Sequence, residues 1–374
     1  MTKHPGEPRP TAAGLTAQEE KEPNAPKTLL GNVWAKLAVS LLIAVAFALV
    51  LKRGGLPLWP SREALASVDR GSCVAYFVLL IGWYFLRAAR WRHLLRPLVP
   101  DISLARVVSV SCIGYGAILV LPLRAGEFVR PYLIQIKERL TMATAMGTIG
   151  AERIIDGLML TALLGFCLQI SSPLSPLPDH IGNLNIPVVA VPLYSYLALT
   201  GFTCAFLLMG LFHLRPTLGK MIVEGTVGLV SNRAAARASE IVTRLSDGLR
   251  FLPRMRYVGP FLLESLVYWG LNALSIMVLA RGCGLHGFSF TQAVVVMGVL
   301  GIGIVVPAGP GLFGAFQAST YAGLAMFYGD EVVLGPGAAF VFLLYAFQSG
   351  WHVVAALFFL ATSRLKSRHA IPVS

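Results

Sequence analysis

The feature that most constrains this chain is the recurrence of uncharged apolar runs long enough to cross a lipid bilayer. A hydrocarbon core of about 30 Å requires roughly 20 apolar residues at about 1.5 Å each. The sequence predicts about six full spans, at residues 33–51, 71–89, 143–170, 191–213, 258–280 and 333–361. Because 56% of the residues are hydrophobic and only 13% are charged, we predict an all-α polytopic membrane helix bundle.

Two further apolar stretches, residues 104–121 and 288–306, differ from the full spans. Each ends at a proline, Pro122 or Pro307, and continues almost at once into a second, glycine-containing segment. Proline removes a backbone donor and glycine permits a turn, so both stretches are predicted to be re-entrant or broken helical hairpins.

The distribution of Lys and Arg predicts the orientation of the chain, because short cytoplasmic loops of membrane proteins are rich in these residues. The loop 171–190 contains neither of them, whereas 215–256 contains one Lys and seven Arg. The rule places both termini in the cytoplasm. The expected location of the chain is the inner membrane of a prokaryotic cell. It also makes the first hairpin enter from the cytoplasmic face and the second from the outer face.

The resulting order is two spans, a hairpin and a span, followed by the same order inverted. Inverted repeats with broken segments at matching positions place binding sites near the midplane in many transporters. Pro122 is followed by Gly126 at the same offset as Pro307 is followed by Gly311. These offsets suggest an inverted repeat; the alternative is chance recurrence in a chain with 23 Pro and 37 Gly.

The terminal segments and the remaining composition assign no further domain. Residues 1–30 are predicted to be a disordered cytoplasmic tail, 31–363 the membrane domain and 364–374 a basic cytoplasmic tail. No cleavable signal peptide is expected, because the first apolar run is long enough to span. The net charge of +13 lies in short clusters between apolar runs, which indicates anionic membrane lipids rather than nucleic acid as partners. The five cysteines occur singly, so we expect no disulfide, metal site or cofactor.

Charged residues at the turn of the first hairpin form the first candidate site. Arg124 and Arg130 flank Glu127, beside Pro122 and Gly126. A guanidinium offers a forked donor that matches phosphate oxygens, so one arginine is expected to bind a lipid phosphate while Glu127 holds the other. The alternative is that both arginines only obey the positive-inside rule at the membrane surface.

A second charged group, Glu152, Arg153 and Asp156, interrupts an apolar span. If that helix starts near Thr141, Glu152 lies about 16 Å along it, near the bilayer middle. The two carboxylates share one helical face, so they require a cation between them or a shared proton. Arg124 or Arg130, a proton or a coupling sodium ion could serve; the alternative is a structural ion pair locking two helices.

Three other groups complete the candidate set. The second hairpin turn contains nothing ionisable and is expected either to line a cavity or only to pack helices closely; its residues are Pro307, Pro310, Gly311, Gly314 and Gln317. A headgroup-layer surface is expected at Arg87, Arg90, Trp91 and Arg92, and another along 231–252. His352 is expected to be a hydrogen-bonded core residue rather than a proton relay.

At these motifs the chain resembles the lysylphosphatidylglycerol synthase transmembrane region family, also called the flippase-like domain. The resemblance covers about residues 33–362 and rests on Arg90-Trp91 with Leu94-Leu95, on Leu121-Pro122 with Arg124, Gly126, Glu127 and Arg130, on Glu152-Arg153 with Asp156, and on Pro307 with Pro310-Gly311 and Gly314. Gln317 departs from the acidic residue that is common there, which puts any role of a carboxylate at this position in doubt.

The resemblance implies a lipid translocator, since the best-known members move aminoacylated phosphatidylglycerol to the outer leaflet. We expect no lysyl-lipid synthesis, because the synthase domain that follows in those members is not expected here. The resulting expectation is a flippase or scramblase and not an enzyme, with a charged midplane site between the two hairpins. The alternatives are a membrane enzyme that acts on a lipid-linked sugar or phosphate, with Glu152 or Asp156 as base, and an accessory subunit of a separately encoded lipid-modifying enzyme.

Overall fold

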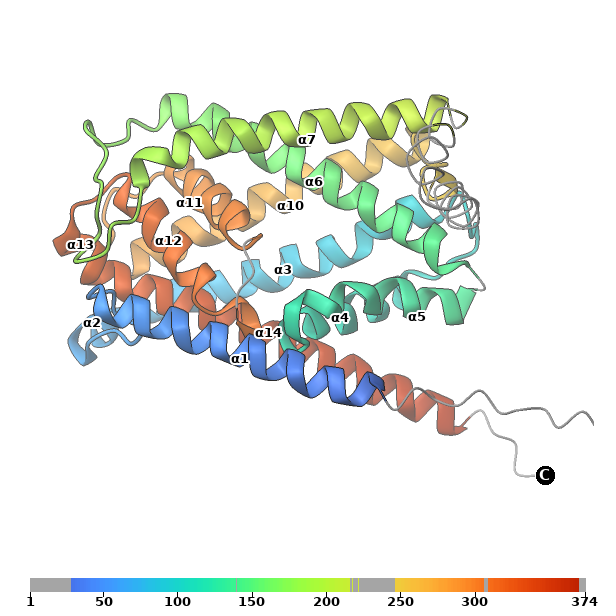
Figure 1. The fold of residues 1–374 in the computed structure, drawn as a ribbon, viewed down its shortest axis with the longest axis horizontal. Coiled ribbons are helices and arrows are strands. Elements are labelled where there is room, and N and C mark those ends of the chain that lie inside the picture. The colour runs from blue at the N-terminus through green and yellow to red at the C-terminus, as the bar shows by residue number, and fades with distance from the viewer. Residues whose placement is uncertain are drawn as a thin grey trace, which may run out of the picture.

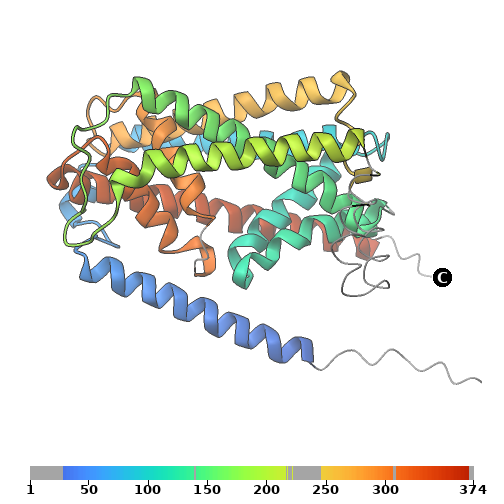
Figure 2. The same cartoon turned by 45° about the horizontal axis from the view of Figure 1, so that its top comes forward.

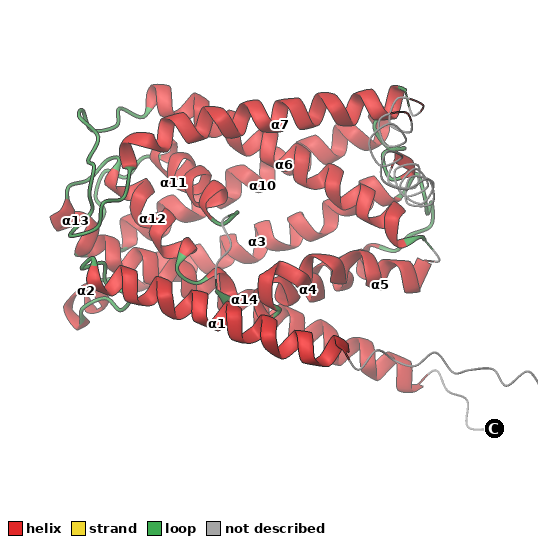
Figure 3. Cartoon of the chain, viewed as in Figure 1, coloured by secondary structure: helices red, strands yellow, loops and turns green. Residues whose placement is uncertain are grey.

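The computed structural model is a bundle of long helices lying side by side (Figure 1), and every regular element in the described residues is a helix (Figure 3). The structure describes residues 28–138, 140–215, 217, 221, 246–305 and 309–369. Residues 1–27 of the expected N-terminal tail, 231–245 of the expected surface helix and Pro307 lie outside these ranges. Residues 364–369, expected in a tail, continue the last helix.

Six long helices coincide with the six runs predicted to span. They are α1 (Thr28–Arg53), α3 (Arg70–Leu95), α6 (Met142–Ile170), α7 (Val191–Leu214), α10 (Met255–Gly282) and α14 (Pro336–His369). The last five of these contain stretches long and apolar enough to cross a membrane. The predicted all-α polytopic bundle is therefore confirmed.

Several helices begin at a short polar side chain, which accepts hydrogen bonds from amides that have no partner within the helix. The carboxylate of Asp69 accepts from the amides of Gly71 and Ser72 at the start of α3. The hydroxyl of Thr141 accepts from the amide of Thr144 at the start of α6. This helix therefore begins near Thr141, as expected from the sequence.

Both broken hairpins are present. The first consists of α4 (Leu104–Val120), the short helix η1 (Pro122–Phe128) and α5 (Val129–Glu138), and the second of α11 (Phe290–Gly303), η3 (Pro310–Leu312) and α12 (Ala315–Ala325). The first hairpin opens at the end of the bundle where α1 begins and α14 ends; the second opens at the opposite end, beside α13 (Asp330–Leu334) (Figure 1). The two turns approach each other, since α4 contacts η3.

The packing of the two halves is reciprocal. Helix α3 of the first half packs along α10 of the second. Helix α4 packs on α14, while α11, its counterpart in the second half, packs on α6. Corresponding helices run in opposite directions, so the order of elements and their contacts both have the form of an inverted repeat (Figure 1).

Helix α1 is set apart from the bundle (Figure 2) and reaches it at the turns of both hairpins. Glycines make this approach close: a Cβ atom added to Gly309 or Gly314 would lie 2.3 Å from the side chain of Ala44 or Phe47. Gly314 also has a φ of +91°, a conformation in which a residue with a side chain is strained. Helix α1 thus covers the irregular backbone of both turns. The remaining short helices, α2 (Arg62–Ala66) and η2 (Val188–Ala190), lie in connections between the long ones.

The turn of the first hairpin depends on Gly126. A Cβ atom on this residue would lie 2.2 Å from the carbonyl carbon of Ala117 on α4, too close for any side-chain movement to relieve. We therefore expect Gly126→Ala to lower the thermal midpoint of the detergent-purified protein and its folded yield, measured by size-exclusion fluorescence. Gly150→Ala is the matched control, because nothing lies within 4 Å of its new methyl group. Equal loss in both variants would contradict this packing.

The opposite orientation of the hairpins can be tested by chemical labelling. Lys137 near the end of α5 and Glu331 in α13 are both exposed and lie at opposite ends of the bundle. In a chain whose five native cysteines are replaced, we expect a membrane-impermeable maleimide added to intact cells to label Glu331→Cys and not Lys137→Cys. Disruption of the cells should make both reactive. Labelling of both from outside would refute the inverted arrangement.

Candidate functional site

An arginine and an aspartate inside the bundle hold α3 against α6. The two terminal guanidinium nitrogens of Arg90 donate to Asp156, Nη1 to Oδ1 at 2.6 Å and Nη2 to Oδ2 at 2.5 Å. Arg90 Nη1 also donates to the hydroxyl of Ser265 on α10, at 2.5 Å. Arg90 is completely buried, and a two-pronged pair of this kind is the strongest geometry available to arginine and a carboxylate. This contact ties three helices together.

A second buried pair joins the first hairpin to α6. Arg130, at the start of α5, donates from Nη2 to Oε2 of Glu152 at 2.9 Å, and both side chains are almost fully buried. Arg90 Nη2 lies 3.6 Å from the other oxygen of Glu152. The two carboxylates on one face of α6 are thus joined by arginines from two different elements.

Aromatic rings surround these arginines. The Arg130 guanidinium carbon lies 4.3 Å from the centre of the Trp91 ring and 5.1 Å from that of Tyr115. Arg90 lies 4.9 Å from the centre of the Tyr268 ring. Rings attract cations through their negative faces, and more strongly where water is excluded. The indole Nε1 of Trp91 donates to the hydroxyl of Thr148 at 3.1 Å, so this ring is fixed in place.

Two further arginines of the cluster have no carboxylate within 4.0 Å among the described side chains. Arg87 lies one turn before Arg90 and contacts the rings of Tyr115 and Tyr268. Arg153 follows Glu152 on α6, and Glu127 on η1 acts on it electrostatically at longer range. The cluster therefore contains four guanidinium groups and three carboxylates, of which that of Glu127 lies farther away. Its described side chains carry an excess of positive charge.

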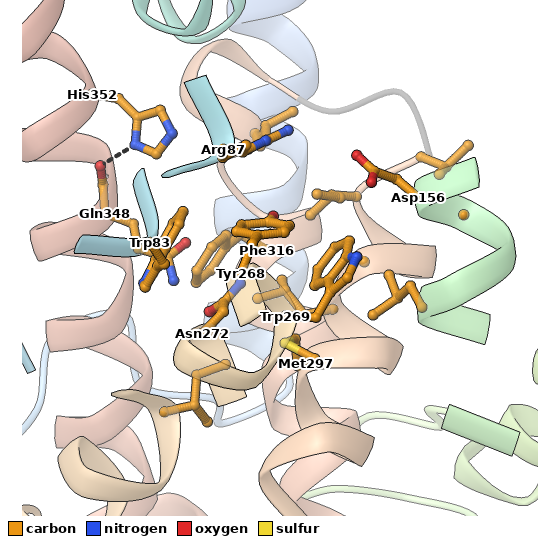
Figure 4. A pocket seen from close by; sticks show the side chains of 18 of the residues that line it. Trp83, Arg87, Asp156, Tyr268, Trp269, Asn272, Met297, Phe316, Gln348 and His352 are labelled. Atoms are coloured by element: carbon orange, nitrogen blue, oxygen red, sulfur yellow. Dashed lines mark hydrogen bonds between the residues drawn. The ribbon is translucent and has the colours of Figure 1, made fainter. Parts of the chain in front are cut away.

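Arg87, Arg153 and Asp156 line a cavity of about 260 Å³ in the middle of the bundle. In Figure 4, Arg87 and Asp156 lie toward one side of it, Gln348 and His352 come from α14, and Trp83, Tyr268 and Trp269 lie between them. Both hairpins contribute to the wall, the first through Leu119 and the second through Gly311 and Leu312. The cavity therefore lies where the two turns approach each other.

The structure brings together some of the residues expected at the site. Arg130 and Glu152 are in contact, which is one of the pairings considered for Glu152. The side chain of Arg124 lies outside the described residues. Gln317 is buried, and its side-chain oxygen accepts a hydrogen bond from the amide of Gly314 at 2.7 Å, so here it closes the first turn of α12.

The expected lipid-facing surface at 87–92 requires correction. Arg90 and Trp91 are completely buried, and Arg87 lines the cavity. Of the four residues, Arg92 alone is both partly exposed and outside the cavity lining. The physical reason is that α3 continues to Leu95 and packs along α10, so this segment lies inside the bundle. The Nδ1 of His352 lies 2.6 Å from the carbonyl oxygen of Gln348, which is the kind of hydrogen bond expected for a core histidine.

Sequence reasoning missed the uncharged polar and aromatic residues of the wall. These are Trp83 on α3, Tyr268, Trp269 and Asn272 on α10, and Gln348 on α14. A signal was available: Ser265, Tyr268 and Asn272 recur at helical spacing in an apolar span, which predicts one polar face.

Fold and site together define a polytopic helical membrane protein with two opposed broken hairpins and an arginine-rich cavity between them. The model of the lysylphosphatidylglycerol synthase TM region family matches residues 33–362, and the chain belongs to this family. A relative, the glycosyltransferase AglD of Haloferax volcanii, is 23% identical over 297 residues. The match covers 74% of this chain and 46% of AglD, so the chain spans about half the length of that relative. No solved structure matches.

The buried pair of Arg130 and Glu152 can be tested by neutralisation. Glu152→Gln leaves Arg130 buried without its partner, and breaking such a pair costs about 3–5 kcal/mol. We expect a large fall in the free energy of unfolding, measured by SDS titration of the detergent-solubilised protein.

The double variant Arg130→Gln/Glu152→Gln should recover part of this loss, because neither member of the pair then remains charged without the other. Glu63→Gln is the control, since Glu63 is exposed on α2. A double variant no more stable than Glu152→Gln would show that the two groups do not act as a pair.

Proposed function

We propose that this protein translocates a lipid with an anionic, phosphate-bearing headgroup between the two leaflets of the membrane. The observation that carries the proposal is the position of Arg87 and Arg153. Both line the central cavity, and among the described residues neither has a carboxylate at ion-pair distance. An anionic headgroup would supply the close negative partner that no described carboxylate provides within 4.0 Å of these two arginines.

The cost of burying charge supports this proposal. A charged side chain at the bilayer centre costs about 2.5–3.5 kcal/mol on insertion scales, so such residues are paired, hydrated or functional. Arg90 and Arg130 are paired with carboxylates, and their role is to hold helices together. Arg87 and Arg153 remain available to a ligand, and an arginine fork matches two oxygens of a phosphate.

The size and location of the cavity also suit a headgroup. Pockets for drug-sized ligands measure roughly 300–1,000 Å³, and this one of about 260 Å³ is smaller. Its wall includes Val305, which lies just after α11 and is 62% exposed. A headgroup could therefore occupy the cavity while its hydrocarbon chains remain in the surrounding lipid.

A second candidate is a membrane module that works with, or as part of, an enzyme of lipid-linked sugars. The Haloferax volcanii relative is named a glycosyltransferase, which favours this candidate, although this chain spans about half of that protein. Purified protein that converts a lipid-linked sugar without moving it would support this candidate over translocation.

Translocation can be measured in proteoliposomes that contain fluorescent phosphatidylglycerol. Dithionite added outside quenches only the probe in the outer leaflet, so the rate at which the remaining fluorescence is lost reports the rate of movement from the inner leaflet. We expect Arg87→Gln and Arg153→Gln each to reduce this rate roughly tenfold, the effect of one lost charged hydrogen bond. Arg254→Gln is the matched control, since Arg254 is exposed and does not line the cavity.

A thermal midpoint for each variant would separate transport defects from misfolding. Wild-type rates in folded Arg87→Gln and Arg153→Gln would refute the proposal, as would a wild-type protein that moves no anionic lipid.

A further inference from the structure

The residues that line the cavity include buried polar atoms that have no hydrogen-bond partner among the described residues. They are Nε of Arg87 and Arg153, Nε1 of Trp83 and Trp269, and Oδ1 of Asn272. Trp83 is 2% exposed and Asn272 is 8% exposed, so both side chains are buried. Buried polar groups in proteins nearly always have partners, and each that lacks one requires an explanation. Five such atoms around one cavity point to a ligand that is itself rich in hydrogen-bonding groups.

These atoms belong to charged and to uncharged side chains that lie close together. The arginines come from α3 and α6, and the Arg87 guanidinium carbon lies 5.8 Å from the centre of the Tyr268 ring. Trp83, Tyr268 and Trp269 form a continuous aromatic wall, with ring centres 5.8 Å apart between Trp83 and Tyr268 and 4.5 Å apart between Tyr268 and Trp269. Asn272 lies one helical turn beyond Tyr268 on α10, beside this wall (Figure 4).

The chemistry of the wall selects the kind of group that would fill it. An apolar chain would leave the indole N–H groups and the amide oxygen unsatisfied, at a cost in free energy for each. A cationic group would lie beside guanidinium groups that already exceed the nearby carboxylates. A neutral ring with several hydroxyl groups satisfies both requirements, because its hydroxyls pair with the indole and amide groups and its C–H faces lie on the aromatic rings.

We infer that the headgroup bound in this cavity is a glycosyl phosphate, with its phosphate at Arg87 and Arg153 and its sugar against Trp83, Trp269 and Asn272. The inference rests on the proposed function and names the substrate class of the same site. Asp156 contributes as well, since its carboxylate lines the cavity and each oxygen retains a lone pair for a sugar hydroxyl. The lipid is thus a sugar-carrying one, and the sugar is a determinant of its affinity.

The test compares two short-chain lipids of equal charge, farnesyl phosphoryl glucose and farnesyl methyl phosphate, binding to the full-length protein in detergent. Both are phosphodiesters, so the difference between their dissociation constants isolates the sugar. We expect the glucosyl lipid to bind roughly tenfold or more tightly, as two or three added hydrogen bonds would give. Trp269→Phe and Asn272→Ala should reduce this ratio toward one while the methyl ester binds as before.

Trp351→Phe is the matched control. The indole Nε1 of Trp351 is also buried without a partner, but the residue does not line the cavity, so the ratio should remain that of the wild type. Equal affinity of the wild-type protein for the two lipids would overturn the sugar assignment while leaving the proposed function intact. Failure of both lipids to bind, or binding that Arg153→Gln leaves unchanged, would instead count against the phosphate site and the proposed function.

Discussion

Neutralisation of buried charge is the constraint around which the bundle is built. Arg90 and Arg130 lie among apolar helices, where an unpaired charge is costly and a charge pair is strongly attractive. The carboxylates of Glu152 and Asp156 meet them from one face of α6. Because the arginines come from α3 and α5, this one face fixes a long helix and a hairpin at the same time. The aromatic rings around the guanidinium groups exclude water from these pairs.

The two hairpins contribute different properties to the cavity. The first brings Arg130 to α6 and so delivers charge to the middle of the bundle. The second contributes an irregular backbone at Gly311 and Leu312, in a turn whose described residues contain nothing ionisable. Non-helical backbone at membrane depth is tolerated where protein covers it or where it faces a wet cavity. Here α1 covers one side of both turns and the cavity lies on another.

Much of the fold could be predicted because its causes are local in the sequence. Long apolar runs predict the spanning helices, and Pro122 predicts the end of α4. The pairing of Arg130 with Glu152 was foreseeable because the first hairpin has to return along a neighbouring span. The same rules could not predict whether residues 87–92 are exposed or buried. An excess of arginine near a helix end is equally compatible with a membrane surface and with a buried face.

What decides between those two cases is the partner that the helix packs against, which is not encoded locally. Arg90 is buried because α10 and α6 lie beside it. The aromatic and amide wall was missed for a related reason: Trp83, Trp269 and Asn272 carry no charge and lie in apolar spans. Their position on inward faces becomes informative only when α3 and α10 are placed together.

The reciprocal packing of α4 on α14 and of α11 on α6 has a consequence for how the chain is made. The ribosome delivers the first hairpin long before it delivers α14, the helix that packs on α4. Until then that hairpin has its ionic contact with α6 but not its apolar neighbour. The two halves are therefore interleaved rather than sequential, and the first half gains its full set of native neighbours only after the helices of the second half have been synthesised.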